Sequence, residues 1–180
     1  VLGEGEATAG LVLLGEQPGD QEEREGRPFI GPAGDVLRSA WAEAGLSPGE
    51  LYLTNAVKHF RHTVQTPPDG QGRGKRRLHK RPTTQHASRC QPWLDAEMEV
   101  VRPQALVCLG VTALRTVLGP TARLPAAHAP PQVTQSKYAA STLATFHPAA
   151  ILRTAEEGRK ELMRAHLVET LRAARAASFR

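Results

Sequence analysis

The apolar residues of this chain gather into four short runs separated by longer, more polar segments. The runs are GLVLLGE (10–16), LYLTNAV (51–57), ALVCLG (105–110) and TLATF (142–146). Runs that are apolar almost throughout, without strict alternation, are typical of strands buried on both faces of a parallel sheet. The pattern therefore predicts four strands of such a sheet.

Between and after these runs, apolar residues recur at the three- and four-residue spacing of amphipathic helices. This spacing covers residues 33–46, 88–103, 111–119 and 156–177. Strands that alternate with helices define an α/β fold with a parallel sheet. The length of 180 residues suits a single domain over residues 1–180.

Two segments are predicted to be loops. Residues 61–86 combine prolines and glycines with a cluster of basic residues, and residues 119–137 are rich in alanine and proline. In parallel sheets, ligand sites form beyond the carboxyl ends of the strands. The polar segments in those positions are GEQPGDQEEREGRPFIGPAG (15–34), TNAVKHF (54–60) and FHPAAILR (146–153).

Charge and cysteine content narrow the class of protein. The net charge of +5 and the pI of about 9.7 favour a polyanionic partner, nucleic acid before an anionic membrane surface. The chain has no apolar run of about 18 residues, and its first residues do not resemble a signal peptide, so we expect an intracellular protein without a membrane span. Cys90 and Cys108 are too few for a disulfide scaffold, and Cys108 is expected to be a plain buried thiol.

The glycine-rich segment 15–34 is not a common phosphate-binding loop, because it lacks both Gly-Lys-Ser/Thr and the GxGxxG spacing. Glu16 and Asp20 could orient a water molecule or stabilise a cation. Phe29 is either a core residue or a ring on which a base stacks. A second segment, GKRRLHKRP (74–82), places His79 among cations. It is either a solvated basic loop or a nucleic-acid loop in which the histidine does chemistry.

From about Val1 to Arg153 the chain resembles the uracil-DNA glycosylase superfamily, specifically its iron–sulfur family 4 branch. The resemblance is carried by GEQPGDQE…GRPFIGPAG, TNAVKH and HPAAILR, while GKRRLHKRP resembles the loop of the UdgX subgroup, whose pattern reads KRRIH. It implies a three-layer α/β/α sandwich around a central four-stranded parallel sheet. It also implies a monomer in the bacterial cytoplasm that acts on uracil-containing DNA, single-stranded DNA in particular.

The resemblance assigns the recognition of a flipped-out uracil to three residues. Phe29 would stack on the base, and Asn55 would pair with its edge through an amide that both donates and accepts. His147 would donate to uracil O2 and stabilise the leaving anion. The structural alternatives are a core residue for Phe29, a strand-end cap for Asn55 and a helix-start residue for His147.

In the UdgX subgroup the loop histidine attacks the sugar carbon that uracil leaves and forms a stable covalent bond. The implied catalytic residues are His79, Glu16, Gln17, Asp20 and His147. Glu16 would hold or polarise His79, with Gln17 and Asp20 nearby. The attacking imidazole must be neutral, and the surrounding cations would favour that form by like-charge repulsion while gripping phosphates. The implied DNA-binding cations are Lys75, Arg76, Arg77, Lys80, Arg81 and Arg153.

Two other functions remain open from the sequence. One is a family 4 uracil-DNA glycosylase that turns over, with water as the nucleophile and His79 only contacting DNA. The other is a non-catalytic DNA- or RNA-binding module that has kept the fold.

The family 4 resemblance also implies a [4Fe–4S] cluster with four protein ligands. His59 and Cys90 occupy two of the ligand positions, and a histidine at the first of these suits the UdgX subgroup. The other two ligands, a CxxC pair, would lie before Val1, or else the chain has lost its cluster. The alternative for His59 is a surface histidine.

Overall fold

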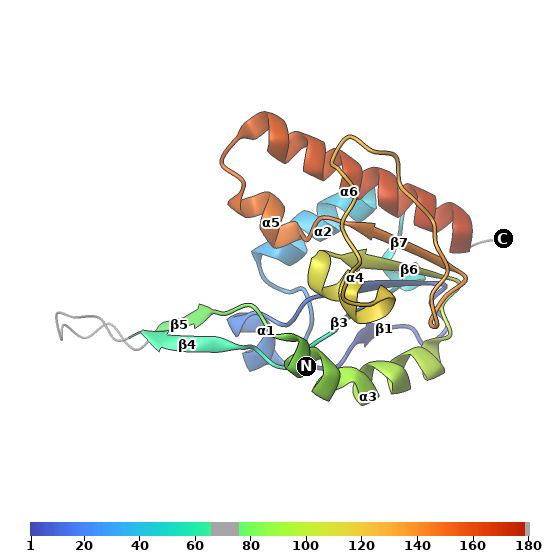
Figure 1. Ribbon diagram of the computed structural model, residues 1–180. Helices are drawn as coiled ribbons and strands as arrows, with labels where there is room; N and C mark the ends of the chain where they lie inside the picture. Colours follow the sequence, from blue (N-terminus) through green and yellow to red (C-terminus); the bar gives the residue numbers. More distant parts are fainter. Residues whose placement is uncertain (66–75, 179–180) are drawn as a thin grey trace.

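The computed structural model describes residues 1–65 and 76–178 of the chain. Its central sheet has the strand order β1-β3-β2-β6-β7 (Figure 1). Four of these strands match the predicted runs and pair in parallel: β2 (Leu11–Gly15), β3 (Leu51–Asn55), β6 (Ala105–Leu109) and β7 (Ser141–Thr145). The predicted parallel sheet is confirmed. The strand β1 (Glu4–Gly5) adds an antiparallel edge that is too short to leave an apolar run.

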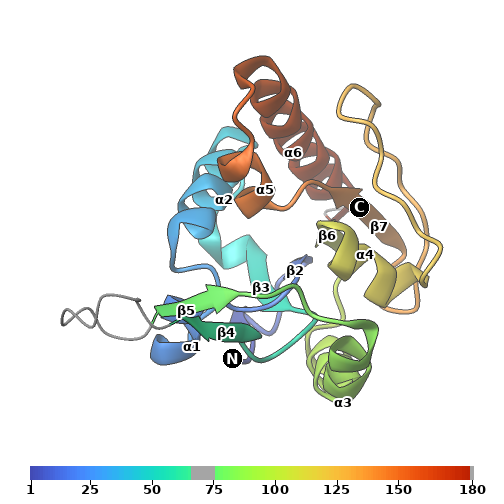
Figure 2. The ribbon, with the colours of Figure 1, turned by 60° about the vertical axis from the view of Figure 1, so that its left-hand side comes forward.

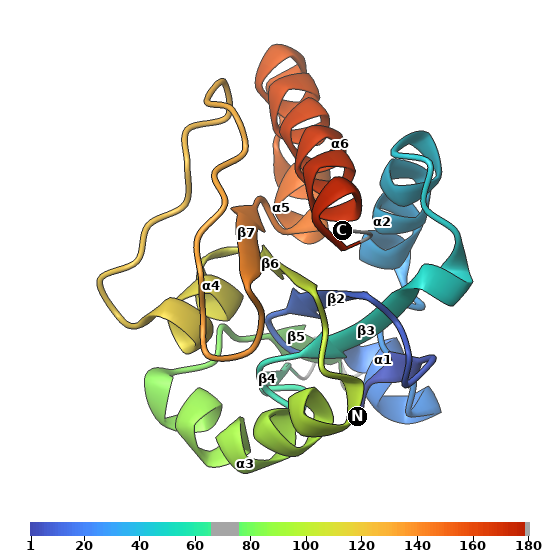
Figure 3. The same ribbon diagram turned by 90° about the vertical axis from the view of Figure 1, so that its right-hand side faces the viewer.

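Helices cover both faces of the sheet, so the predicted three-layer arrangement is confirmed (Figure 3). The helices expected from the sequence are α2 (Pro32–Glu43), α3 (Thr84–Val101), α4 (Val111–Leu118) and α6 (Glu157–Ser178). Three shorter elements left no periodic pattern: α1 (Asp20–Glu25), the 3-10 helix η1 (Pro48–Glu50) and α5 (Pro148–Arg153). Within the described residues, no helix combines the length and the apolar character needed to cross a membrane.

The two faces of the sheet carry separate apolar cores, because successive strand residues point to opposite sides. In β2, Leu11 and Leu13 pack with α2, α5 and α6, whereas Val12 and Leu14 pack with α3 and α4. All four side chains are fully buried, and each contributes about 1.5–3 kcal/mol by leaving water. The burial of β2 on both faces fixes the position of the residues that follow it.

A hairpin stands apart from the sheet, where the sequence predicted only a loop over residues 61–86. β4 (His62–Gln65) pairs antiparallel with β5 (Arg76–His79), which sets His62 opposite His79. Figure 2 shows the hairpin beside α1. The prediction was wrong for these strands because both are short and polar, so a local apolar pattern does not reveal them. Residues 119–137, all described, contain no helix or strand, as predicted.

A buried ion pair ties the end of β3 to α3. Lys58 Nζ lies 2.7 Å from Glu97 Oε2 and donates to Thr54 Oγ1 at 2.8 Å. The backbone nitrogen of Gly3 donates to the other Glu97 oxygen at 2.9 Å. The Lys58 side chain is only 4% exposed and that of Glu97 only 9%. Burial lowers the pKa of Lys58, and Glu97 opposes this shift, so the carboxylate helps to keep the buried ammonium charged.

Glu97→Ala is expected to destabilise the protein by about 3–5 kcal/mol, because it leaves the Lys58 ammonium buried without its counter-charge. Urea unfolding at neutral pH measures the change. The exposed neighbour Glu99 provides the control, since Glu99→Ala should change the free energy of unfolding by less than about 0.5 kcal/mol. Equal losses in the two variants would show that the buried pair has no special role.

Candidate active site

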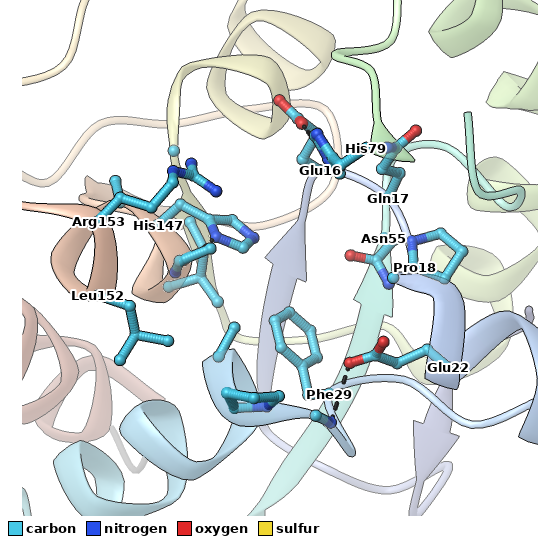
Figure 4. Close-up of a pocket in the computed structure, with 18 of the residues that line it drawn as sticks. Glu16, Gln17, Pro18, Glu22, Phe29, Asn55, His79, His147, Leu152 and Arg153 are labelled. Atoms are coloured by element: carbon cyan, nitrogen blue, oxygen red, sulfur yellow. Dashed lines mark hydrogen bonds and ion pairs between the residues drawn. The ribbon is translucent and has the colours of Figure 1, made fainter. Parts of the chain in front are cut away.

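A cavity of about 670 Å³ opens at the carboxyl ends of the parallel strands (Figure 4). Its lining comes from the ends of β3 and β6, from the segments after β2, β6 and β7, and from the end of the hairpin. Glu16, Asn55 and His147 converge there, together with His79 and Arg81. The structure thus brings together at one strand edge the residues that the sequence assigned to a single site.

The floor of the cavity is the ring of Phe29, and its place depends on two glycines. Phe29 is 5% exposed and has a φ of 54°, which is uncommon for a residue with a side chain. A Cβ at Gly15 would lie 2.6 Å from the ring and 2.3 Å from Asn55 Oδ1. A Cβ at Gly34 would lie 1.7 Å from the Phe29 carbonyl oxygen. The glycines are therefore required by the close approach of Phe29 and Asn55.

Asn55 ends β3 and points its amide into the cavity (Figure 4). The residue is 3% exposed, and its Oδ1 is buried without a hydrogen-bond partner among the described residues. A buried amide oxygen without a partner costs about 1–3 kcal/mol. The site is therefore built to receive a hydrogen-bond donor from a bound molecule.

His147 begins a helix and also lines the cavity. As the N-cap of α5, its Nδ1 accepts a hydrogen bond from the backbone nitrogen of Ala149 at 3.1 Å. In the neutral ring the proton is therefore on Nε2, which is buried and has no partner within the described part of the chain. Burial lowers the pKa of His147 to about 4, although Glu16 opposes the shift. His147 is therefore a neutral ring whose Nε2–H donor is unused.

Glu16 joins the cavity to the hairpin. Its Oε1 lies 3.5 Å from His79 Nε2, and its Oε2 accepts a hydrogen bond from Thr112 Oγ1 and lies 3.9 Å from Arg81 Nε. Burial would raise the pKa of Glu16, but hydrogen bonds from His79 and Thr112, together with the charge interactions of His147 and His79, hold the pKa below its usual value. The sequence resemblance implied that Glu16 would hold or polarise His79, within a loop rich in cations. In the structure the Glu16 carboxylate lies beside the imidazole ring.

Gln17 fixes the base of the hairpin. Its Nε2 donates to the carbonyl oxygen of Lys80 at 3.1 Å, and its Oε1 accepts from the backbone nitrogen of Arg61 at 3.0 Å. The residue is 7% exposed and lines the cavity. Both ends of its amide are thus used to hold the hairpin, which is a structural task next to the candidate site.

Arg77 is held by carboxylates of α1 rather than directed to solvent. It forms one ion pair with Asp20 and another with Glu23 at 2.9 Å. Its guanidinium also lies 5.7 Å from the centre of the Phe60 ring. Only 24% of the Arg77 side chain is exposed. The sequence grouped Arg77 with the phosphate-binding cations and Asp20 with the catalytic residues, whereas the structure pairs the two with each other.

The other predicted DNA-binding cations are exposed wherever the structure describes them. Arg76, Lys80 and Arg81 are exposed on and after β5, and Arg153 is exposed at the end of α5 beside the cavity. Lys75 lies outside the described residues. Of these exposed cations, Arg81 and Arg153 line the cavity, where a polyanion could approach.

Two residues of the site were not among the sequence-based candidates. Glu22 is 8% exposed, lines the cavity and accepts a hydrogen bond from the Gly31 backbone nitrogen at 3.0 Å. Nothing in the acidic run QEERE distinguishes it. Thr112, which donates to Glu16 from just outside the cavity lining, lies two residues after the run 105–110, so the rule that sites form at strand ends could have identified it.

The two predicted cluster ligands lie in one region. His59 is exposed, while Cys90 is 4% exposed and its Sγ accepts a hydrogen bond from the Lys58 backbone nitrogen at 3.3 Å. The amino group of Val1 donates to the Lys58 carbonyl oxygen in the same region. Among the described residues, no group of three or more His, Cys, Asp or Glu side chains could hold a metal ion. These residues alone do not make a four-ligand site, and no chemical step below passes through one.

Comparison with known proteins identifies the class. The sequence matches the family model for the uracil DNA glycosylase superfamily over residues 2–172. The chain belongs to this superfamily, as the sequence resemblance indicated.

Its relatives include proteins named type-4 uracil-DNA glycosylase. The protein of Thermotoga maritima is 34% identical over 114 residues, which cover 63% of this chain and 52% of that protein. The protein of Pyrobaculum aerophilum is 30% identical over 159 residues, which cover 85% of this chain and 73% of that protein. The protein of Archaeoglobus fulgidus is 34% identical over 110 residues, 61% of this chain and 48% of its own length. The chain therefore matches between about half and three quarters of each relative.

Arg77→Ala is expected to loosen the hairpin, whereas Arg76→Ala should leave it intact, because neighbouring strand residues point to opposite sides. Hydrogen exchange of the Lys80 amide, which bonds to Arg61, should be at least about tenfold faster in the first variant. The Arg76 variant should instead bind DNA with a salt dependence lowered by about one unit. Faster exchange of the Lys80 amide in both variants would contradict the assignment of Arg77 to the hairpin and Arg76 to DNA binding.

Proposed function

We propose that this protein excises uracil from DNA and then becomes covalently linked to the abasic sugar through His79. The observation that carries the proposal is the position of His79, held by Glu16 beside the cavity in which Asn55 and His147 present unpartnered polar atoms. Membership of the superfamily supports uracil as the base. The match of GKRRLHKRP with the UdgX loop supports the covalent step.

The unpartnered atoms of the cavity complement the edge of uracil. Asn55 Oδ1 needs a donor, and uracil offers N3–H. His147 Nε2–H needs an acceptor, and uracil offers the neighbouring O2. The Asn55 amide nitrogen can donate to O4 on the other side, and the Phe29 ring forms a face on which the base stacks. Binding of uracil would thus satisfy both buried polar atoms.

In the chemical step the bond between the sugar carbon C1′ and uracil N1 breaks, and its electron pair leaves with uracil. The negative charge that develops on uracil O2 is stabilised by the buried Nε2–H donor of His147. A neutral donor is well suited to this task because it is not consumed by proton transfer. The sugar is left with an oxocarbenium-like carbon at the mouth of the cavity.

His79 would then attack this carbon with the lone pair of one ring nitrogen, and a C1′–N bond would form. The nearby Glu16 carboxylate favours the tautomer whose proton lies on the nitrogen facing it. After attack the imidazole is cationic, and it can pass that proton to Glu16. The product is a neutral imidazole joined to C1′, so the atoms and charges balance.

The substrate proposed is single-stranded DNA bound by a monomer. The net charge of +5 and the exposed side chains of Arg76, Lys80, Arg81 and Arg153 suit contacts to phosphates. Arg77 is left out of this set because its charge is already matched by α1.

A second candidate is a glycosylase that turns over. The His79 side chain is 46% exposed, so water can reach the same sugar carbon. Denaturing gels of the protein with uracil-containing single-stranded DNA separate the possibilities. A protein–DNA band that survives boiling in detergent supports covalent linkage. Cleavable abasic product without such a band supports turnover, and neither product supports a non-catalytic module.

His79→Ser is expected to abolish the covalent band and to release uracil over repeated turnovers, because cleavage depends on Asn55 and His147 while trapping depends on His79. Cleavage is measured by the free uracil and abasic product that appear, and trapping is measured by the covalent band on the gel. His62→Ser is the matched control, since His62 lies opposite His79 across the hairpin. It should still form the band. A detergent-resistant adduct in the His79 variant would assign the nucleophile to another residue.

The rate of uracil release by His79→Ser should be unaffected by His147 between pH 8 and about pH 5, because the ring stays neutral over this range. The rate should fall as the pH approaches about 4. Below that value the ring of His147 is protonated, and the new proton on Nδ1 opposes the donor of Ala149. Single-turnover release rates across this range test the prediction. A decline centred near pH 6.5, the ordinary histidine value, would contradict it.

A further inference from the structure

Glu16 has partners from two different parts of the molecule. His79 and Arg81 approach it from β5 and the segment that follows. Thr112 approaches it from α4, which packs on the sheet. His147 lies close enough to act on its charge. The carboxylate therefore stands between the projecting hairpin and the rigid body of the domain.

The Thr112 hydroxyl decides which oxygen of Glu16 is left for His79. A carboxylate has two equivalent oxygens and can rotate between partners. Thr112 Oγ1 donates to Oε2, and Oε1 is the oxygen that faces His79 Nε2 at 3.5 Å. Without this donor, the nearest charged group to Oε2 is the guanidinium of Arg81 at 3.9 Å, which would draw the carboxylate away.

Thr112 is well placed to impose this orientation, because its backbone is fixed. It is the second residue of α4. Gly110 precedes the helix with a φ of 89°, and the Leu114 backbone nitrogen bonds to the Gly110 carbonyl oxygen at 3.1 Å. The hydroxyl is thus presented from a defined helix start rather than from the hairpin.

We infer that Thr112 is a positioning residue for the covalent step: it orients the Glu16 carboxylate toward His79, so that the imidazole is held over the cavity and can lose its proton after attack. The inference rests on the proposed covalent function. Thr112 lies outside the set that binds uracil, so its effect should fall on trapping more than on cleavage.

The test compares Thr112→Val, which removes the hydroxyl at nearly constant volume, with Thr112→Ser, which keeps it. Adduct formation and uracil cleavage are measured in single turnover between about pH 4 and pH 8. The valine variant should form the adduct about tenfold more slowly, since a hydrogen bond to a charged group is lost, and should cleave uracil within about threefold of wild type. The serine variant should restore trapping.

The pH profile gives a second readout. Hydrogen bonds from His79 and Thr112 hold down the pKa of Glu16 against the effect of burial. Loss of the Thr112 hydroxyl should raise that pKa, so the acid limb of adduct formation should move to higher pH in the valine variant. The charged and titratable neighbours, His79, Arg81 and His147, are unchanged in both variants.

Thr116→Val is the matched control, because Thr116 lies one turn along α4 and its hydroxyl bonds to the Thr112 carbonyl oxygen at 2.9 Å. It should leave the trapping rate and its pH profile as in wild type. The inference is overturned if Thr112→Val traps as fast as wild type with the same profile, if the serine variant is equally slow, or if the Thr116 variant shows the same defect. A wild-type protein that forms no adduct at all would instead overturn the proposed covalent function, and the inference with it.

Discussion

The structure of the site depends on the close approach of backbone and side chains at the end of β2. This strand lies between β3 and β6 and is buried on both faces, so the residues that follow it have little freedom. Three consecutive positions use this rigidity in different ways. Gly15 leaves the space that Phe29 and Asn55 occupy, Glu16 reaches His79, and Gln17 holds the hairpin. One strand end therefore sets the pocket floor and the position of His79 together.

The same region keeps polar atoms buried without partners, and this has a thermodynamic cost. Asn55 Oδ1 and His147 Nε2 together cost about 2–6 kcal/mol, by the usual penalty for each buried unsatisfied group. Burial of a few leucines in the two cores can offset this amount. A ligand that supplies one donor and one acceptor at the right spacing would recover the penalty on binding. The site thus favours a ligand that brings one hydrogen-bond donor and one acceptor.

The sequence predicts the regular core of the fold better than the elements at the site. The strands of the parallel sheet and four helices follow from apolar runs and helical spacing, because burial on both faces leaves a strong local pattern. The hairpin does not, since its strands are polar and are held by Gln17, Asp20 and Glu23 from a distant part of the chain. The sequence resemblance likewise counted Arg77 among the DNA-binding cations. Only the structure shows that α1 neutralises it.

Structural and functional interpretations of a residue need not exclude each other, and His147 illustrates why. The sequence left open a helix-start residue or a group that acts on uracil. The structure makes it the N-cap of α5 through Nδ1, and that bond removes the uncertainty about where the proton lies, because only Nε2 can carry it in the neutral ring. The cap therefore prepares the donor that the proposed chemistry needs. Burial, which raises the cost of protonation, keeps the same tautomer over the pH range in which most enzymes work.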